Sequence, residues 1–202
     1  MHSVIESLGG WINAGLGFLY PEMCQLCMQA RATSAEGFVC GACRAQVHRI
    51  QPPFCQRCGL PFEGAITTAF DCGNCRELEP QFTWARAAVV ARDDVLEVIH
   101  RYKYRRALWF EPFLAQLLIE AAAQQLAGEG WNQIVPVPLH PARKREREFN
   151  QAQRLAACLS AATRIPIELR LIHRIVATPT QTQLTREERR ANMRRAFAVA
   201  GK

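Results

Sequence analysis

Four CxxC pairs constrain the fold of this 202-residue chain more than any other feature of its sequence. Successive pairs are separated by 12, 11 and 13 residues, and the pairs are Cys24/Cys27, Cys40/Cys43, Cys55/Cys58 and Cys72/Cys75. A CxxC pair on a tight turn directs two sulfur atoms at one metal ion, and two such pairs complete a tetrahedron. The repeat therefore predicts Zn²⁺ sites. A disulfide-stapled module or a thioredoxin-like redox pair is the alternative, which a reducing cytosol disfavours.

The sequence leaves the pairing of the CxxC motifs open. Sequential pairing is expected over interleaved or nested pairing, and it gives one site from Cys24, Cys27, Cys40 and Cys43 and another from Cys55, Cys58, Cys72 and Cys75. Four thiolates leave no coordination position for water or substrate, so the metal is structural. A segment of about 55 residues with few large aliphatic side chains needs such a metal to fold. The ninth cysteine, Cys158, is predicted to be a small buried apolar residue.

The formal net charge of +7 at pH 7 favours an anionic partner such as nucleic acid. Zn²⁺ bound by four thiolates carries a net charge of about −2, so two sites would lower the total to about +3. Local clusters of basic residues are therefore more informative than the global charge.

Residues 1–20 are predicted to form an amphipathic helix. They contain Glu6 and lack the basic stretch that begins a signal peptide. No apolar run reaches the roughly 18 to 20 residues that a membrane-spanning helix needs. We therefore expect a cytoplasmic protein without a membrane span.

Pro80 marks a predicted boundary between the cysteine-rich module, residues 21–80, and a second domain, residues 81–202. In the second domain, segments rich in β-branched residues alternate with segments of helical periodicity. Strands are expected within 84–92, 133–139, 167–175 and 197–200, and helices within 94–104, 108–126 and 149–162 and from Thr185 onward. Asp93 or Asp94 is the expected N-cap of the first helix. The alternation predicts an α/β fold with a parallel sheet.

A basic segment, residues 139–148, follows the predicted strand that ends near Pro138. It is expected to be a loop at the carboxyl edge of the sheet, where ligands of α/β proteins bind, and it contains His140, Arg143, Lys144, Arg145 and Arg147. Arginine side chains and the N–H groups of the following helix suit phosphate. A solvated surface, in which Glu146 and Glu148 pair with the arginines, fits the same residues equally well.

A second polar segment, residues 178–195, begins as a loop and is expected to become a helix near Thr185. Its glutamines, Gln181 and Gln183, have the groups to hydrogen-bond a ligand, and its arginines outnumber its two carboxylates. From the residues alone, an exposed amphipathic helix is favoured. A nucleic-acid-binding stripe is the alternative, although few aromatic residues interleave for base stacking.

Four motifs are specific in combination. VPVPLH stands at Val135–His140, and an RxRGFNQ-like motif spans Arg145–Gln151 with Glu148 where glycine is usual. A TPxQTxL…RxxN…AF pattern runs from Thr178 to Phe197, and an HxxKY motif stands at His100–Tyr104. In these motifs, and over nearly its whole length, the chain resembles the ComF/GntX family of competence-associated, phosphoribosyltransferase-like proteins.

The resemblance implies a double zinc ribbon followed by an incomplete parallel-sheet phosphoribosyltransferase-type domain that binds phosphoribosyl pyrophosphate with Mg²⁺. Residues 139–148 would hold the pyrophosphate, and residues 178–192 would close over it. The implied substrate-binding residues are Lys103, His140, Arg143, Arg147, Asn150, Gln151, Gln181 and Arg189. Among them, Lys103, Arg143 and Arg147 would stabilise the departing charge, whereas Asn150 and Gln151 would shape the loop. The acidic, Thr/Gly-rich motif that grips the ribose 5-phosphate in the family is missing, so a truncated copy is expected.

The leading hypothesis is therefore a ComF-like protein acting in DNA uptake or nucleotide-linked metabolism, with transferase activity dependent on the missing motif. Two alternatives are kept. One is a non-catalytic module that binds single-stranded DNA through its zinc ribbons and arginines. The other is an adaptor for proteins of the competence machinery.

Overall fold

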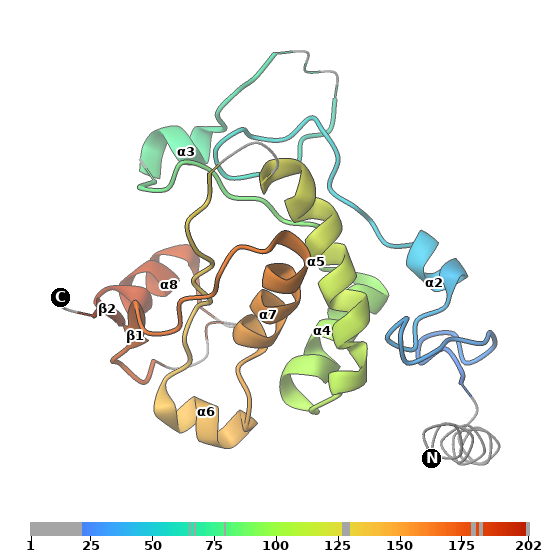
Figure 1. The fold of residues 1–202 in the computed structure, drawn as a ribbon. Coiled ribbons are helices and arrows are strands. Elements are labelled where there is room, and N and C mark those ends of the chain that lie inside the picture. The colour runs from blue at the N-terminus through green and yellow to red at the C-terminus, as the bar shows by residue number, and fades with distance from the viewer. Residues whose placement is uncertain are drawn as a thin grey trace.

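The computed structural model of the chain describes residues 22–64, 66, 68–78, 80–126, 130–178, 181 and 184–200. The predicted N-terminal helix lies outside these residues. Figure 1 shows the elements in chain order, which are α2 (Gly41–Ala45), α3 (Gly73–Leu78), α4 (Asp93–Tyr104), the 3-10 turn η1 (Leu108–Phe110), α5 (Glu111–Leu126), α6 (Pro141–Arg147), α7 (Gln151–Thr163), β1 (Ile172–Arg174), α8 (Arg186–Met193) and β2 (Phe197–Val199).

The three longest helices build the main core. The helix α5 packs along α7, and η1 joins α4 to α5 (Figure 1). On α4, Val95, Val98 and Tyr102 recur at the spacing of one buried helix face. Phe110 in η1 and Phe113 in the first turn of α5 are also fully buried. The predicted helices within 94–104, 108–126 and 149–162 are thus confirmed to within a few residues.

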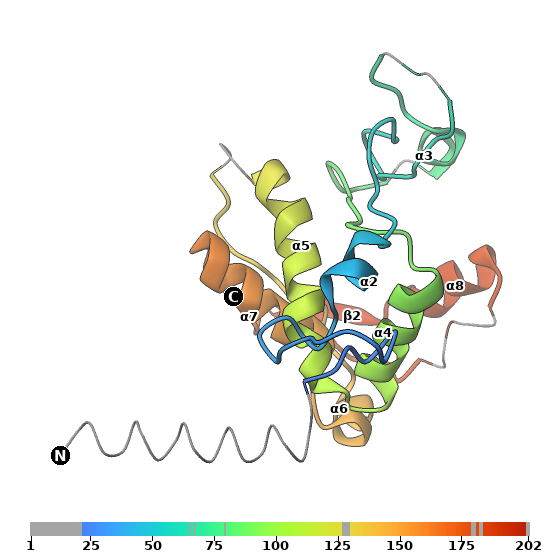
Figure 2. The ribbon, with the colours of Figure 1, turned by 90° about the vertical axis from the view of Figure 1, so that its right-hand side faces the viewer.

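The two cysteine modules attach to this core differently. The first ribbon, residues 22–47, shares one buried cluster with α4 and α5, to which it contributes Cys24, Ala32, Val39, Cys40 and Cys43. The second ribbon, residues 53–80, has a separate small cluster of Cys55, Cys72 and Cys75 with Cys58 and Phe70. Figure 2 shows the second ribbon, around α3, projecting away from the helices. Only the first ribbon is therefore built into the main core.

Two extended segments connect the second ribbon to the rest of the chain. Ile50 N–H donates to the carbonyl of Ala88 at 3.1 Å, and Val90 N–H donates to that of His48 at 2.9 Å. The pairing ends after one antiparallel bridge because Pro52, which follows, has no N–H to donate. The predicted strand within 84–92 is therefore an extended segment and not a regular strand.

The sheet differs from the prediction. Among the described residues the only named strands are β1 and β2, and they pair antiparallel, with His173 opposite Ala198. Within the described ranges, parallel pairing is limited to a single bridge between Ile134 and Ile167. The segment 133–139, predicted as a buried strand, is half-buried, and Val137 is 61% exposed. Its two prolines cannot donate to a ladder, which explains why the pairing does not continue.

The basic segment is a helix and not the predicted loop. Pro141 begins α6, where its fixed φ suits the first turn. The Nδ1 atom of His140 caps the helix by accepting the N–H of Ala142 at 3.3 Å.

The predicted cap of α4 was also wrong. Arg92 is the N-cap residue, and Asp93 and Asp94 lie in the first turn, where negative charge is favoured by the helix dipole.

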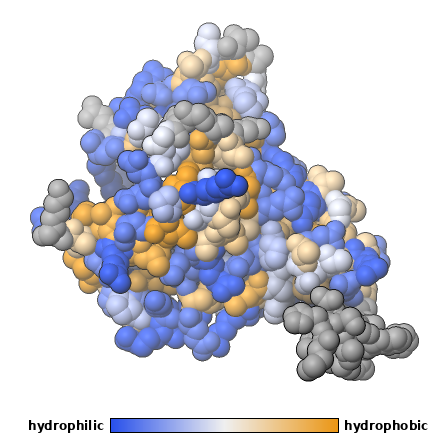
Figure 3. Space-filling model, viewed as in Figure 1, coloured by the Kyte–Doolittle hydropathy of each residue, from blue (hydrophilic) through white to orange (hydrophobic). Residues whose placement is uncertain are grey.

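Figure 3 shows that hydrophilic residues cover the lower part of one face, where α6 lies. Apolar residues gather above it, near β1 and β2. Exposed aliphatic side chains in that region include Leu169, Ile175, Val176 and Val199. No helix in the described ranges has the length and apolar content to cross a membrane.

Candidate functional site

Both cysteine clusters have the geometry of a four-thiolate metal site. In each cluster the four Sγ atoms lie within 4.8 Å of one another. The Sγ–Sγ distance is 3.7 Å for Cys24/Cys43 and 3.8 Å for Cys27/Cys40. Tetrahedral Zn²⁺ with bonds of about 2.3 Å places its sulfur ligands about 3.8 Å apart. The four-thiolate sets therefore fit Zn²⁺.

The sequential pairing of the CxxC motifs is confirmed. The second cluster repeats the first, with Sγ–Sγ distances of 3.8 Å for Cys55/Cys75 and 3.7 Å for Cys58/Cys72. The remaining cysteine, Cys158, lies outside both clusters and is half-buried instead of buried as predicted.

Backbone donors favour the thiolate form of Cys24 and Cys55, whereas burial and the neighbouring sulfur atoms raise the pKa values of Cys43 and Cys75. The N–H of Cys40 donates to the Sγ of Cys24 at 3.3 Å, and the N–H of Cys72 donates to that of Cys55 at 3.3 Å. Burial alone would raise the pKa of the Cys24 thiol, but such bonds lower it to about 6. The pKa of Cys55 falls to about 6 for the same reason. Deprotonated sulfur is the form that binds Zn²⁺.

A cationic cavity of about 520 Å³ lies where α4, α6, α7, β1 and α8 converge. Its lining comprises Lys103, Tyr104, Leu139, Arg143, Arg147, Gln151, Arg174, Thr178, Gln181 and Arg189. Five of these described lining residues carry a positive charge, and none carries a carboxylate. Six of the eight residues proposed from the sequence to bind substrate are thus brought together from separate segments.

Contacts within the cavity hold its cations in place. Arg147 stacks over the ring of Tyr104, with its guanidinium carbon 4.8 Å from the ring centroid. It also donates to the Oε1 of Gln151 at 3.3 Å. The Nε of Arg189 donates to the carbonyl of Gln181 at 3.1 Å. Side chains fixed in this way lose little further entropy when a ligand binds.

Lys103 is the cavity residue whose pKa is shifted by its surroundings. Burial and the neighbouring charge of Arg147 both lower the pKa of its ammonium group. An anion placed between these two side chains would relieve that repulsion. The cavity is therefore prepared for negative charge.

Two predicted site residues do not line the cavity. His140 caps α6, as described above. Asn150 caps α7, because its Oδ1 accepts the N–H groups of Ala152 at 3.0 Å and Gln153 at 3.4 Å. Its Nδ2 donates to the carbonyl of Val137 at 3.1 Å. Asn150 thus shapes the turn between the helices, which is the role expected for it.

Arg174 is a cavity residue that the sequence reasoning missed. It stands on β1, and its Nη2 donates to the hydroxyl of Thr178. Its Nε atom is buried without a partner among the described residues. The sequence carried a weak signal, since Arg174 lies near the end of the predicted strand 167–175, shortly before the polar segment at 178.

Comparison with known proteins identifies the family. The double zinc ribbon family model matches residues 15–76. Competence protein F of Haemophilus influenzae is 30% identical over 171 residues, which are 82% of this chain and 72% of that protein. The chain belongs to the ComF family. The DNA utilization protein YhgH of Escherichia coli K12 is 30% identical over 184 residues, 89% of this chain and 78% of that protein.

A more distant relative in the ComF family is competence protein ComFC of Bacillus subtilis. It is 27% identical over 139 residues, 64% of this chain and 54% of that protein. No solved structure matches the chain significantly.

Glu148, which replaces the glycine usual in the ComF motif, does not line the cavity. It ends α6 with φ at 66°, in the left-handed region that favours glycine. Its carboxylate pairs with Arg106 at 2.9 Å. The negative charge of Glu148 is therefore held by that arginine and does not face the cavity cations.

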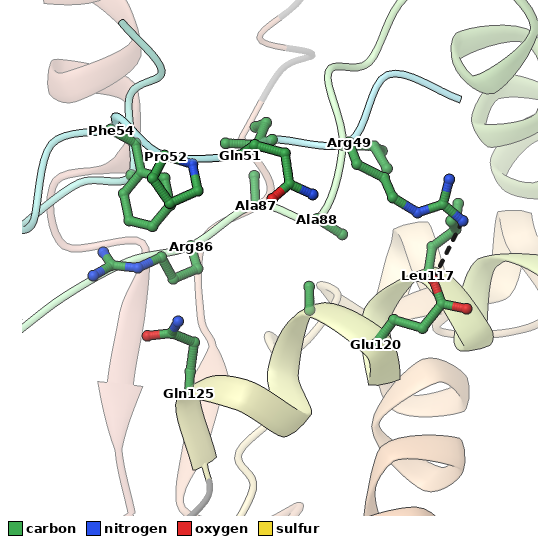
Figure 4. Close-up of a pocket in the computed structure, with 14 residues that line it drawn as sticks. Arg49, Gln51, Pro52, Phe54, Arg86, Ala87, Ala88, Leu117, Glu120 and Gln125 are labelled. Atoms are coloured by element: carbon green, nitrogen blue, oxygen red, sulfur yellow. Dashed lines mark hydrogen bonds and ion pairs between the residues drawn. The ribbon is translucent and has the colours of Figure 1, made fainter. Parts of the chain in front are cut away.

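A second cavity of about 330 Å³ lies where the connecting segments of the second ribbon meet α5 (Figure 4). An ion pair between Arg49 and Glu120, 3.3 Å long, stands at one side. At the other side, the guanidinium carbon of Arg86 lies 4.8 Å from the centroid of the Phe54 ring. The second ribbon thus meets the helical core across a partly hollow junction.

Proposed function

We propose that this ComF-family chain binds a sugar diphosphate of the phosphoribosyl pyrophosphate type in the cationic cavity, in a role linked to DNA uptake or use. The observation that carries the proposal is the convergence of Lys103, Arg143, Arg147, Arg174 and Arg189 without a carboxylate among the described lining residues. Arg143 is already paired with Glu146 at 2.7 Å, outside the lining. The other four cations have no ion pair among the described residues, and their mutual repulsion favours an anionic ligand. The relatives are a competence protein and a DNA utilization protein, and these names support the link to DNA.

The proposed ligand chemistry follows from the residue types. Arginine holds phosphate oxygens through two parallel N–H donors, which a lysine cannot do. In a transfer reaction, Arg143, Arg147 and Lys103 would stabilise the charge that develops on departing pyrophosphate. Arg147 would do this by position alone, because Tyr104 and Gln151 already hold its guanidinium. A phosphoribosyltransferase-type reaction is therefore the enzymatic form of the proposal.

Magnesium has a limited place in this proposal. Protein sites for Mg²⁺ use carboxylate oxygens, and the described cavity lining offers none. The ion would reach the cavity bound to the phosphates of the ligand. Zn²⁺ in the cysteine clusters would supply rigidity, with no coordination position left for substrate.

The proposal is tested by ligand binding to the 202-residue chain. Phosphoribosyl pyrophosphate at millimolar concentration with Mg²⁺ should raise the melting temperature, and isothermal titration should give a dissociation constant. Arg143→Ala combined with Arg147→Ala should weaken binding at least about 100-fold, since each charged hydrogen bond contributes about 1.5–3 kcal/mol.

Arg190→Ala is the matched control. Arg190 lies on α8, is exposed, and does not line the cavity. Its variant should bind as the parent does. A melting temperature that does not respond to the ligand, or equal losses in both variants, would refute the proposed site.

Single-stranded DNA binding is the second candidate function. It is favoured by aromatic side chains near arginine, because the Trp84 and Trp131 rings lie 5.7 Å apart and Arg86 lies over Trp84. It predicts affinity that falls steeply with salt. The second ribbon is a poor DNA-binding surface, however. Between Gln51 and Pro80 the sequence has four carboxylates and two arginines, before the negative charge of a thiolate-bound Zn²⁺.

The two candidates differ in what the Arg143→Ala, Arg147→Ala double variant loses. If the chain binds DNA, the double variant should lose affinity for an oligonucleotide. Phosphoribosyl pyrophosphate should then bind neither the parent nor the variant. An adaptor role, the third possibility, predicts that neither ligand binds.

A further inference from the structure

A polar cluster, buried at its tyrosine and exposed at its arginine, joins helices that contribute to the cationic cavity. Tyr102 of α4 is 1% exposed, and its hydroxyl donates to the Oε2 of Glu111 at 2.7 Å. The Oε1 of Glu111 accepts the Nη2 of Arg154, on α7, at 2.9 Å, and the Nε of Arg154 also bonds to Oε2. The Glu111 carboxylate, at the start of α5, therefore joins this helix to both α4 and α7.

The negative charge of Glu111 in this cluster is compensated by the positive charge of Arg154. Burial alone would raise the pKa of the Glu111 carboxyl, but the bonds from Arg154 and Tyr102 lower it below its ordinary value. Burial and the Glu111 carboxylate raise the pKa of the Tyr102 hydroxyl. The cluster therefore keeps a neutral tyrosine, an ionised carboxylate and a guanidinium at neutral pH.

Two members of the cluster lie near cavity residues on their own helices. Tyr102 immediately precedes Lys103 and Tyr104 on α4. Arg154 follows Gln151 by three residues, which places both on one side of α7. None of the three residues lines the cavity, but their bonds join α4 and α7, two of the helices that contribute to its lining.

A ring contact ties α6 to the same cluster. The ring of Phe149, in the turn between α6 and α7, meets the Tyr102 ring edge-on at 5.6 Å. The preceding helix carries Arg147, which stacks on Tyr104. Movement of Tyr102 would therefore shift Lys103 and Arg147 relative to each other.

We propose that Tyr102, Glu111 and Arg154 are positioning residues that set the spacing between Lys103 and Arg147 across the cationic cavity, and thereby its affinity for diphosphate. This inference rests on the proposed anion site. It assigns a function to three residues that have no place in the motifs of the family.

The first test replaces the tyrosine hydroxyl alone. Tyr102→Phe should keep the ring contacts and the metal content but weaken binding of inorganic pyrophosphate at least about fivefold, because binding groups must be held within about 0.5 Å of their positions. Glu111→Gln, which removes the charge that Arg154 needs, should have the same effect and provides a second route if Tyr102→Phe folds poorly.

The second test reads the position of Lys103 directly. The chain has only three lysines, Lys103, Lys144 and Lys202, so NMR of ¹³C-methylated lysines can follow each one through a pH titration. In the parent, burial and Arg147 lower the pKa of Lys103. In Tyr102→Phe that pKa should rise toward the ordinary value of a lysine side chain, and the signal of exposed Lys144 serves as the internal reference.

Phe113→Leu is the control for simple loss of stability. Phe113 is fully buried on the other side of α5, against Gly37 of the first ribbon. This variant should lower the melting temperature without moving the pKa of Lys103 or the pyrophosphate affinity. An unmoved Lys103 pKa in folded Tyr102→Phe and Glu111→Gln proteins would overturn the inference. If the parent does not bind pyrophosphate, the proposed function fails, and the Lys103 titration still decides this inference.

Discussion

Cys43→Ser and Cys75→Ser each remove one of four thiolates from a metal site, yet we expect their effects on the fold to differ greatly. Cys43 belongs to the buried cluster that also contains Val98, Phe113 and Leu117 of the helical core. Cys75 belongs to a cluster whose other members are three cysteines and Phe70. Loss of the first metal therefore removes support from the main core, whereas loss of the second affects one projecting ribbon.

The magnitudes decide the prediction. A structural Zn²⁺ contributes about 10 to 16 kcal/mol to the folding of a small module. A whole domain is stable by only about 5 to 15 kcal/mol. The free energy lost with the first metal ion is therefore as large as the whole free energy of unfolding. Cys43→Ser should have no cooperative melting transition. Cys75→Ser should retain the main transition within a few degrees, because the junction below the second ribbon is partly hollow.

Three measurements on the same preparations test this prediction. Metal analysis should give two Zn²⁺ per chain for the parent and one for Cys75→Ser. Thermal melting followed by near-ultraviolet circular dichroism should report the main core. Hydrogen exchange should show new exposure confined to residues 53–80 in Cys75→Ser. A lost main transition in Cys75→Ser, or a retained one in Cys43→Ser, would refute the reasoning.

Three further predictions concern single residues. Asn150→Ala should lower the free energy of unfolding by about 1 kcal/mol in urea titrations through loss of the α7 cap, whereas Asn150→Asp should keep the cap and lose only the bond to Val137. Glu148→Gly should raise stability by up to about 1 kcal/mol, because φ at 66° suits glycine, less the contribution of the exposed ion pair; a loss of stability would contradict this. Glu111 has a lowered pKa when folded, so its stabilising effect is present above its ordinary pKa of 4.5 and is lost as pH falls through the folded value. Glu111→Gln should flatten that part of the pH–stability curve.

The metal sites were predictable because the chemistry is local. Two sulfurs at CxxC spacing meet one metal whatever surrounds them, so spacing alone gave the ligands and their preferred pairing. What the sequence could not provide is the difference between the ribbons. That difference depends on Val39 and Cys43 contacting α4 and α5, which are more than 50 residues away in the chain.

The cavity was predictable only through the family motifs. The basic segment alone fitted a phosphate site and a solvated surface equally well, and it was wrongly expected to be a loop. Pro141 and the absence of glycine before Glu148 are signs of a short helix, but charge drew the interpretation toward a flexible binding segment. Arg174 and the Tyr102–Glu111–Arg154 cluster were missed because contacts between segments far apart in the chain have no signature in local periodicity.

The charge distribution gives the strongest reason to look for ligands on the cavity side of the molecule. The first 80 residues hold five basic and seven acidic side chains, whereas residues 81–202 hold 20 basic and 11 acidic ones. Each four-thiolate Zn²⁺ site adds about −2 to the first part. A small anion is therefore attracted to the part that contains α6 and α8 and repelled by the ribbons, and its association rate should fall as salt screens the attraction. A nucleic acid experiences the same field, so any phosphate backbone this chain holds should be held by α6 and α8, with the ribbons turned away from it.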